Sequence, residues 1–198
     1  MWVWILKPKQ LAIVLDELEG FLRPKPSLEQ WRTPGGIAAE LAFLASPQGR
    51  SVVDLGTGTG ILAIACKLMG ARRVVGVEND REALEIAMRN AEKLGLEIEW
   101  INTDVLSWQP RESFDIAVLN PPFGSVKRHM DRQFVEKALE VAEEVFALLS
   151  SRARNFWLKN YNARILRTYS FPLPRQHWFH RRKREFMEVD LVYFAGNI

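Results

Sequence analysis

Asn120-Pro121-Pro122-Phe123 is the segment best suited to chemistry on a planar amino group. An amino nitrogen conjugated to a base or an amide has little free lone pair with which to attack carbon. The side-chain carbonyl of Asn120 and the backbone carbonyl of Pro121 could accept its two N–H bonds and favour an sp³-like nitrogen. The two prolines would keep the turn rigid, and Phe123 would offer an aromatic face to the target ring. Taken alone, Asn-Pro-Pro is also an ordinary turn signal.

A second motif, Asp54-Leu-Gly-Thr-Gly-Thr-Gly60, joins two hydrophobic segments. Gly56, Gly58 and Gly60 permit a tight turn and a close approach of a ligand to the backbone. The dinucleotide pattern G-x-G-x-x-G is not met, because Ile61 stands where the last glycine would fall, and the Lys-Ser/Thr pair of a phosphate-binding loop is missing. The motif therefore predicts a ligand-binding turn that differs from both of these patterns.

Alternating strands and helices are expected to position both motifs. The alternation predicts an α/β fold with a parallel sheet, and in such sheets ligands bind at the carboxyl ends of the strands. The Asn-Pro-Pro-Phe segment follows the fourth strand and the glycine motif follows the first. The first five expected strands are 51–55, 73–78, 97–101, 114–119 and 145–149, with helices at 60–68, 80–95 and 131–144.

The flanking segments complete the expected architecture. Helices are predicted at 8–19 and 36–45 before the alternation and at 152–161 after it, followed by strands at 165–173 and 186–194. The whole is a seven-stranded, mostly parallel sheet with helices on both faces. No linker or repeat interrupts the chain, so residues 1–198 are expected to form a single domain. Within it, residues 1–46 would be a helical cap over the ligand site and residues 47–198 the seven-stranded core.

Composition excludes several other classes of protein. The 198 residues are 47% hydrophobic and 26% charged, and the single cysteine, Cys66, is expected to be buried filler rather than a catalytic thiol. A membrane span needs about 18 apolar residues in a row, and the sequence has none, so we expect a soluble cytoplasmic protein. Residues 151–198 contain 10 Lys and Arg against 3 Asp and Glu, whereas residues 1–150 contain 17 against 21. This asymmetry indicates either a platform for a polyanion or a solvated basic surface.

The two motifs together resemble the class I methyltransferases, which have a Rossmann-like seven-stranded sheet and bind S-adenosylmethionine. The resemblance implies that Asp54 lies near the methionine end of this cofactor and that Glu78 holds the two ribose hydroxyls. A carboxylate suits the ribose because it can accept hydrogen bonds from both hydroxyls. The resemblance also implies that Asp104 lies beside the adenine amine. The alternatives are an exposed strand end for Glu78 and a turn-forming residue for Asp104.

Three further segments make the resemblance more specific. Leu28-Glu-Gln-Trp-Arg-Thr-Pro34, the Asn-Pro-Pro-Phe-Gly loop and Phe179-His-Arg-Arg-Lys-Arg with Met187-Glu-Val-Asp-Leu-Val192 resemble methyltransferase-like protein five and its archaeal relatives. The likeness covers about residues 21–194. It implies N6-methylation of an adenosine in small-subunit rRNA, with Gln30 and Thr33 helping to enclose the cofactor. Trp31, where relatives usually have Tyr, and the spacing before Thr33 depart from the family pattern.

Other functions remain open at this point. A protein glutamine N5-methyltransferase is the nearest alternative, but its Asn-Pro-Pro loop usually ends in Tyr, so Phe123 and the basic carboxyl-terminal segment favour RNA. A DNA adenine methyltransferase is a further enzyme alternative. A non-catalytic RNA-binding or ribosome-assembly factor on the same fold would be a different class. The presence of Asp54, Glu78 and Asn120 together argues against a pure scaffold.

Two basic clusters are candidates for binding RNA. Phosphates attract cationic side chains, and histidine can also stack on an unpaired base. For each cluster, a solvated loop is the alternative. The three histidines have no spacing that suits a zinc site, and no metal is expected. The candidate RNA-binding residues are Lys127, Arg128, His180, Arg181, Arg182, Lys183 and Arg184.

The resemblance also implies a protein partner. Eukaryotic relatives act with a small zinc-binding activator that pairs with the free edge of the sheet. The strand expected at 97–101 should form that edge, and it alternates Ile98 and Trp100 with Glu97 and Glu99. The two glutamates could instead protect the edge against pairing.

Overall fold

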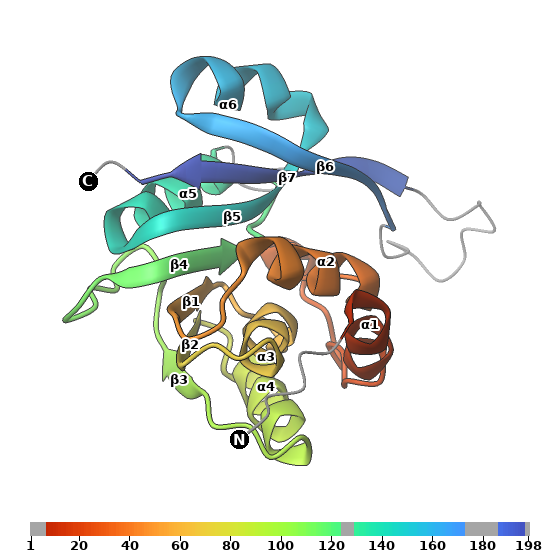
Figure 1. The fold of residues 1–198 in the computed structure, drawn as a ribbon. Coiled ribbons are helices and arrows are strands. Elements are labelled where there is room, and N and C mark those ends of the chain that lie inside the picture. The colour runs from red at the N-terminus through yellow and green to blue at the C-terminus, as the bar shows by residue number, and fades with distance from the viewer. Residues whose placement is uncertain (1–6, 124–128, 173–185, 197–198) are drawn as a thin grey trace.

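A seven-stranded mixed sheet forms the centre of the computed structural model, which describes residues 7–123, 129–172 and 186–196. The strand order is β3-β2-β1-β4-β5-β7-β6 (Figure 1). Strands β1 to β5 pair in parallel, whereas β7 lies antiparallel to both β5 and β6. The strands are β1 (Ser51–Leu55), β2 (Arg73–Glu78), β3 (Glu99–Asn102), β4 (Phe114–Leu119), β5 (Ala142–Ser150), β6 (Ala163–Pro172) and β7 (Phe186–Ala195). The predicted fold class is confirmed.

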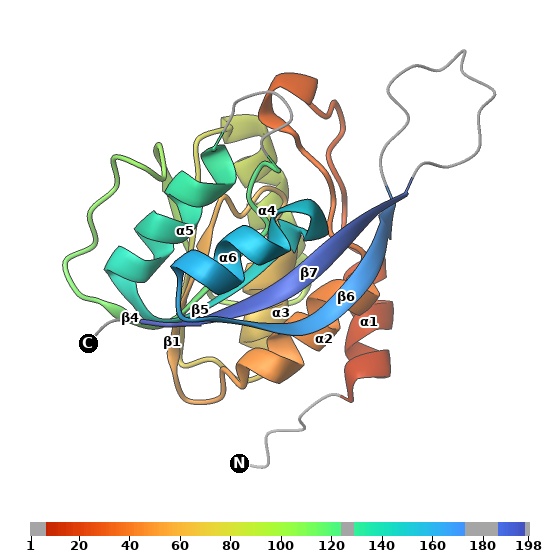
Figure 2. The same cartoon turned by 90° about the horizontal axis from the view of Figure 1, so that it is seen from above.

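Helices cover both faces of this sheet because its central strands are apolar on both sides. Strand β1 is buried at every residue. Helices α1, α2 and α3 pack on one face of the sheet and α5 and α6 on the other (Figures 1 and 2). Each face of the sheet has its own hydrophobic core. The helices are α1 (Pro8–Asp16), α2 (Gly35–Ala45), α3 (Ile61–Leu68), α4 (Arg81–Lys93), α5 (Met130–Val141) and α6 (Arg154–Asn160). Two short 3-10 turns, η1 (Pro26–Leu28) and η2 (Ser151–Ala153), complete the described elements.

The order of strand pairing reverses between β1 and β4. From β1 the chain goes out to β2 and β3, and then returns to pair β4 with the other side of β1. Such a reversal leaves a crevice at the carboxyl ends of the two strands, because their connections leave in opposite directions. Both sequence motifs follow these strands, so the fold brings them to one place.

The boundary between α5 and β5 differs from the sequence prediction. We expected the helix to run to residue 144, but it ends at Val141 and the strand begins at Ala142. Local propensity favours helix through this Ala- and Glu-rich stretch. Pairing overrides it, because Ala142 is in register with Phe114 and Glu144 with Ile116.

Strand β3 also differs slightly from its expected range. It begins at Glu99 rather than at residue 97, because its register with β2 starts with the pair Glu99 and Val75. Its position at the edge of the sheet is confirmed. No helix within the described residues is both long and apolar enough to cross a membrane.

Candidate active site

A cavity of about 370 Å³ lies beside the carboxyl ends of β1, β2 and β4. Its volume lies within the range of roughly 300–1,000 Å³ that is usual for small-molecule sites. Residues distant in sequence share its wall: Ser27, Leu28, Glu29, Gln30, Trp31, Gly56, Glu78, Asn79, Asp104, Val105, Leu106, Asn120, Pro122, Met130, Gln133 and Phe134. The fold thus brings together six of the predicted site residues, which are Gln30, Gly56, Glu78, Asp104, Asn120 and Pro122.

The glycine turn after β1 has the backbone geometry that its sequence predicts. Gly56, Gly58 and Gly60 have φ angles of 75°, 55° and 87°, in the left-handed region that favours glycine. A second reason for glycine is packing, because a Cβ on Gly58 would lie 2.9 Å from the Phe21 ring and one on Gly60 2.9 Å from the Ala87 Cβ. The turn is therefore fixed by neighbouring side chains as well as by its own dihedral angles.

Glu78, at the end of β2, is buried and holds two backbone amides. Its Oε2 accepts a hydrogen bond from the Gly58 N–H at 2.8 Å, and its Oε1 accepts one from the Asp80 N–H at 2.9 Å. Burial raises the pKa of this carboxyl, and the hydrogen bonds from the Asp80 and Gly58 amides oppose the shift. Because each carboxylate oxygen has two acceptor positions, Glu78 can still accept hydrogen bonds from a ligand in the cavity.

Asp54 lies in a small hollow between the glycine turn and Asn120. Its Oδ2 accepts hydrogen bonds from the Thr57 hydroxyl at 2.6 Å and the Ala63 N–H at 2.9 Å. Its Oδ1 is buried and has no hydrogen-bond partner among the described residues. Burial raises the pKa of Asp54 to about 7. A buried, unpaired carboxylate oxygen of this kind is suited to a cationic group, because leaving it unpaired is costly.

Asn120 is held in one orientation by the segment before α2. Its Nδ2 donates hydrogen bonds to the Thr33 Oγ1 at 3.0 Å and to the Trp31 carbonyl oxygen at 3.4 Å. The amide nitrogen is thereby occupied, while the Oδ1 is buried and has no hydrogen-bond partner among the residues that the structure describes. Asn120 belongs to the cavity wall, and its amide oxygen is an acceptor without a partner among these residues. Thr33 is buried and acts here on Asn120 rather than on the wall of the larger cavity.

The rest of the Asn-Pro-Pro-Phe segment is divided between the cavity and the core. Pro122 lines the cavity, and Pro121 is buried. The Phe123 ring lies 5.1 Å from the ring of Trp31 and 6.0 Å from that of Phe171, and it is absent from the cavity wall. Trp31 lines the cavity instead of Phe123. The sequence predicted no role for Trp31 and showed it only as a departure from the family pattern.

Asp104 and Gln30 line the cavity while making contacts within the protein. The Oδ1 of Asp104 accepts a hydrogen bond from the Leu106 N–H at 2.9 Å, which is the turn-forming contact foreseen as its alternative. The Gln30 Oε1 accepts a hydrogen bond from the Lys25 N–H at 2.8 Å, and its Nε2 donates to Asp80. Neither contact prevents these side chains from facing a ligand.

Some cavity residues had no signal in the sequence. The wall also includes Asn79, Met130, Gln133 and Phe134, which belong to none of the sequence motifs. Of these, Asn79 adjoins a predicted site residue, Glu78. The candidate RNA-binding residues Lys127, Arg128, His180, Arg181, Arg182, Lys183 and Arg184 lie outside the described residues. Within residues 7–123, 129–172 and 186–196, no three His, Cys, Asp or Glu side chains are grouped as a metal site would require.

Comparison with known proteins identifies the family. Residues 36–149 match the model of the methyltransferase small domain. The rRNA N(6)-adenosine-methyltransferase metl-5 of Caenorhabditis elegans is 34% identical, over 94% of this chain and 96% of that protein. The Drosophila melanogaster rRNA N(6)-adenosine-methyltransferase Mettl5 is also 34% identical, over 96% of each chain. The chain belongs to the METTL5 family of class I methyltransferases.

A solved structure from Pyrococcus horikoshii, described as a candidate RNA methyltransferase, is similar to this METTL5-family chain. The two are 36% identical and superpose with a TM-score of 0.87, covering 98% of this chain and 99% of the other. The protein is thus an S-adenosylmethionine-dependent methyltransferase. The site fits that cofactor in chemistry, because the buried carboxylate of Glu78 lines the cavity beside the glycine turn and that of Asp54 lies in the small hollow next to it.

Proposed function

We propose that this METTL5-family enzyme methylates the N6 amine of an adenosine in structured RNA, with small-subunit rRNA as the substrate. Two relatives that match over nearly their full length are named as rRNA N(6)-adenosine-methyltransferases. The observation that carries the proposal is the state of Asn120. Its Nδ2 is held by Thr33 and Trp31, and its buried Oδ1 has no hydrogen-bond partner among the described residues.

An acceptor in this position has a definite task in amine methylation. The exocyclic amine of adenine has two N–H donors and a lone pair delocalised into the ring. When the Asn120 Oδ1 accepts one N–H and the Pro121 carbonyl accepts the other, the lone pair becomes more available and its direction is fixed. These oxygens orient the amine as hydrogen-bond acceptors, and the proton that nitrogen loses as it gains the methyl group passes to solvent. Trp31 and Pro122 would bound the target base, with Phe123 supporting Trp31 from behind.

The cofactor would be held by the residues of the glycine turn and the strand ends. Bound S-adenosylmethionine supplies an electrophilic methyl group on a sulfonium. We assign Glu78 to the ribose hydroxyls, Asp104 to the adenine amine and Asp54 to the cationic methionine end. Gly56, Gly58 and Gly60 give the ligand access to the backbone, and residues 1–46 would act as a cap within a single domain.

The basic clusters would bind the RNA backbone. In the sequence, Lys127 and Arg128 come shortly after the catalytic segment, and residues 180–184 come between the residues of β6 and those of β7. Cationic side chains attract the phosphates of RNA, and this charge is what supports the assignment. We propose that the reaction takes place in the cytoplasm, in keeping with a ribosomal RNA substrate.

We also propose that the β3 edge accepts a small zinc-binding activator protein by strand pairing. The supporting feature is the position of β3 at the end of the sheet, where one side of the strand has no partner strand among the described residues. Trp100 is a poor position for testing this, because a Cβ on Gly76 would lie 2.5 Å from its ring and the ring also packs near Gly60. Ile98→Pro is a better variant. It should remove the complex from size exclusion after co-expression, with circular dichroism to show that the chain remains folded.

The deciding experiment for the substrate uses labelled S-adenosylmethionine with total RNA and, separately, total protein. We expect label in N6-methyladenosine after nucleoside analysis of the RNA. Label confined to glutamine side chains in the protein sample would refute the RNA assignment. No label in either sample, although the cofactor and RNA are bound, would contradict the proposed N6-methylation of adenosine in RNA.

A further inference from the structure

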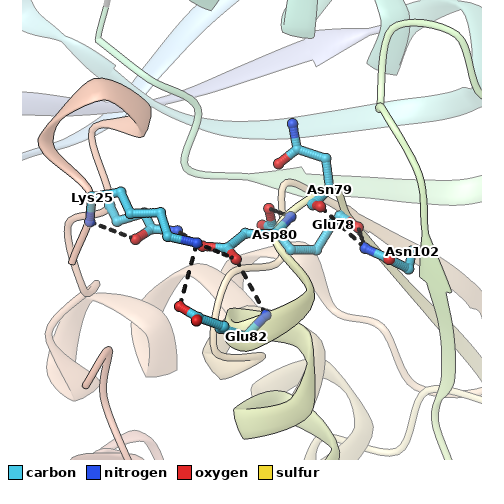
Figure 3. Close-up of polar contacts among 7 residues, drawn as sticks. Lys25, Glu78, Asn79, Asp80, Glu82 and Asn102 are labelled. Atoms are coloured by element: carbon cyan, nitrogen blue, oxygen red, sulfur yellow. Dashed lines mark hydrogen bonds and ion pairs between the residues drawn. The ribbon is translucent and has the colours of Figure 1, made fainter. Parts of the chain in front are cut away.

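Asp80 lies just outside the cofactor cavity and connects two segments that form its wall. It caps α4, with its Oδ1 accepting a hydrogen bond from the Glu82 N–H at 3.2 Å. The same Oδ1 accepts a hydrogen bond from the Lys25 Nζ at 2.8 Å, and the Oδ2 accepts one from the Gln30 Nε2. Figure 3 shows Lys25 reaching Asp80 from the N-terminal segment, with Glu78 and Asn79 beside it.

The segment that Asp80 holds is a large part of the cavity wall. Residues 27–31 all line the cavity, although they lie nearly fifty residues before Glu78 in the sequence. Their backbone includes the short 3-10 turn η1, and Glu29 has a positive φ of 49°. A segment with so little regular structure depends on side-chain contacts for its position.

Asp80 is buried, with 8% of its surface exposed, so its contacts are better formed than an exposed ion pair. Burial by itself raises the pKa of Asp80, but the hydrogen bonds from Lys25 and Gln30 outweigh this and leave the pKa below its usual value. The backbone N–H of Asp80 meanwhile donates to the Glu78 Oε1 at 2.9 Å. Asp80 thus contacts both the N-terminal segment and Glu78, the carboxylate assigned to bind the ribose hydroxyls.

We propose that Asp80 is a positioning residue that fastens residues 25–31 over the cofactor cavity, so that cofactor affinity depends on the Asp80–Gln30 contact. The inference rests on the assigned cofactor and not on the RNA substrate. Capping α4 is the purely structural role that must be separated from it. The different tasks of the two carboxylate oxygens allow this separation.

Asp80→Asn changes one oxygen and keeps the other. The remaining Oδ1 can still accept hydrogen bonds from the Glu82 N–H and the Lys25 Nζ. The new Nδ2, however, would face the Nε2 of Gln30, and two donors cannot form a hydrogen bond with each other. Adding Gln30→Glu restores a donor–acceptor pair in the opposite sense, and the carboxylate can still accept from the Lys25 N–H. Glu82→Gln is the matched control, because it removes only the exposed ion pair to Lys25 at 3.4 Å.

The measurements are the dissociation constants of S-adenosylmethionine and its demethylated product by calorimetry, without RNA. We expect Asp80→Asn to weaken binding about tenfold, the double variant to recover to within about threefold of the parent, and Glu82→Gln to have no effect. Hydrogen exchange should show faster exchange of the amides of residues 25–31 in Asp80→Asn, and protection again in the double variant.

Unchanged affinity and exchange in Asp80→Asn would overturn the proposal. Weak binding that Gln30→Glu does not restore, together with a lower unfolding temperature of the ligand-free protein, would also overturn it and assign Asp80 to capping alone. A parent enzyme that binds the cofactor but leaves adenosine unmethylated would count against the RNA assignment and not against the role of Asp80.

Discussion

The hydrogen bond between Thr33 and Asn120 makes the orientation of the catalytic amide testable with a matched pair of variants. Thr33→Val keeps the shape of a buried side chain but removes the Oγ1 that lies 3.0 Å from the Asn120 Nδ2. The longer contact of 3.4 Å to the Trp31 carbonyl is then the partner that remains. Thr33→Ser keeps the hydroxyl and serves as the control.

The size of the effect follows from the contact that is lost. Removing one partner of a buried hydrogen bond costs about 1–3 kcal/mol, and about 1.4 kcal/mol corresponds to a factor of ten in rate. Because this contact orients the Asn120 amide, we expect Thr33→Val to slow methyl transfer roughly five- to hundredfold at saturating cofactor. Thr33→Ser should stay within about threefold of the parent, since its hydroxyl can form the same bond.

Single-turnover transfer to RNA with labelled cofactor measures the rate, and calorimetry measures cofactor affinity. The affinity of Thr33→Val should change by less than about threefold, because Thr33 does not belong to the wall of the larger cavity. If the variant binds the cofactor weakly but transfers methyl at the parental rate once saturated, Thr33 acts on the cofactor and the reasoning about Asn120 is wrong.

Three other outcomes follow from the same geometry. Asn120→Ala should abolish methyl transfer and leave cofactor affinity within a few-fold of the parent, so normal turnover would remove it from the catalytic site. Glu78→Ala should weaken cofactor binding by about 1.5–3 kcal/mol in calorimetry, the range for hydrogen bonds to charged groups, and an unchanged dissociation constant would contradict the ribose assignment. Burial raises the pKa of Asp54 to about 7, so this group is largely protonated at pH 6 and ionised at pH 8.5 in the free enzyme. Binding of a cationic ligand lowers the pKa of Asp54 and should therefore release a proton at pH 6, which calorimetry in buffers of different ionisation enthalpy measures. Equal proton release by Asp54→Asn would refute the pairing of Asp54 with the cationic ligand.

The sequence predicted the parts of the site that depend on local backbone geometry. The glycine turn was recognisable because positive φ angles at positions 56, 58 and 60 require glycine, and a strand and a helix had to flank it. The edge position of β3 followed from the strand order of the resembled family. By contrast, the predicted end of α5 was wrong, because Ala142 pairs with Phe114, which lies far away in the sequence.

The cavity wall was the least predictable part, since it depends on how distant segments pack. Nothing local to Trp31 indicates that its ring packs against Phe123, nor that Phe134 lies close to Gly56. The sequence assigned the stacking face to Phe123, whereas in the structure Trp31 lines the cavity and Phe123 packs against Phe171. Gln30 was identified, but its bond to Asp80 was not, because a partner fifty residues away has no signature in a single sequence.

The reversal of strand order between β1 and β4 has a consequence for biosynthesis. Strands β1, β2 and β3 can associate as soon as residue 102 has been made, but β4 pairs with β1 only after residue 119. Asn120 follows β4 directly, so the amide assigned to catalysis enters the structure at the step that joins the two halves of the sheet. Asn120, Met130, Gln133 and Phe134 also belong to the cavity wall, so a nascent chain that ends before this step contains Asp54 and Glu78 but lacks part of the cavity. Cofactor binding and competence for methyl transfer should therefore arise together, only after β4 and α5 have joined the sheet, and stalled chains of graded length would test this.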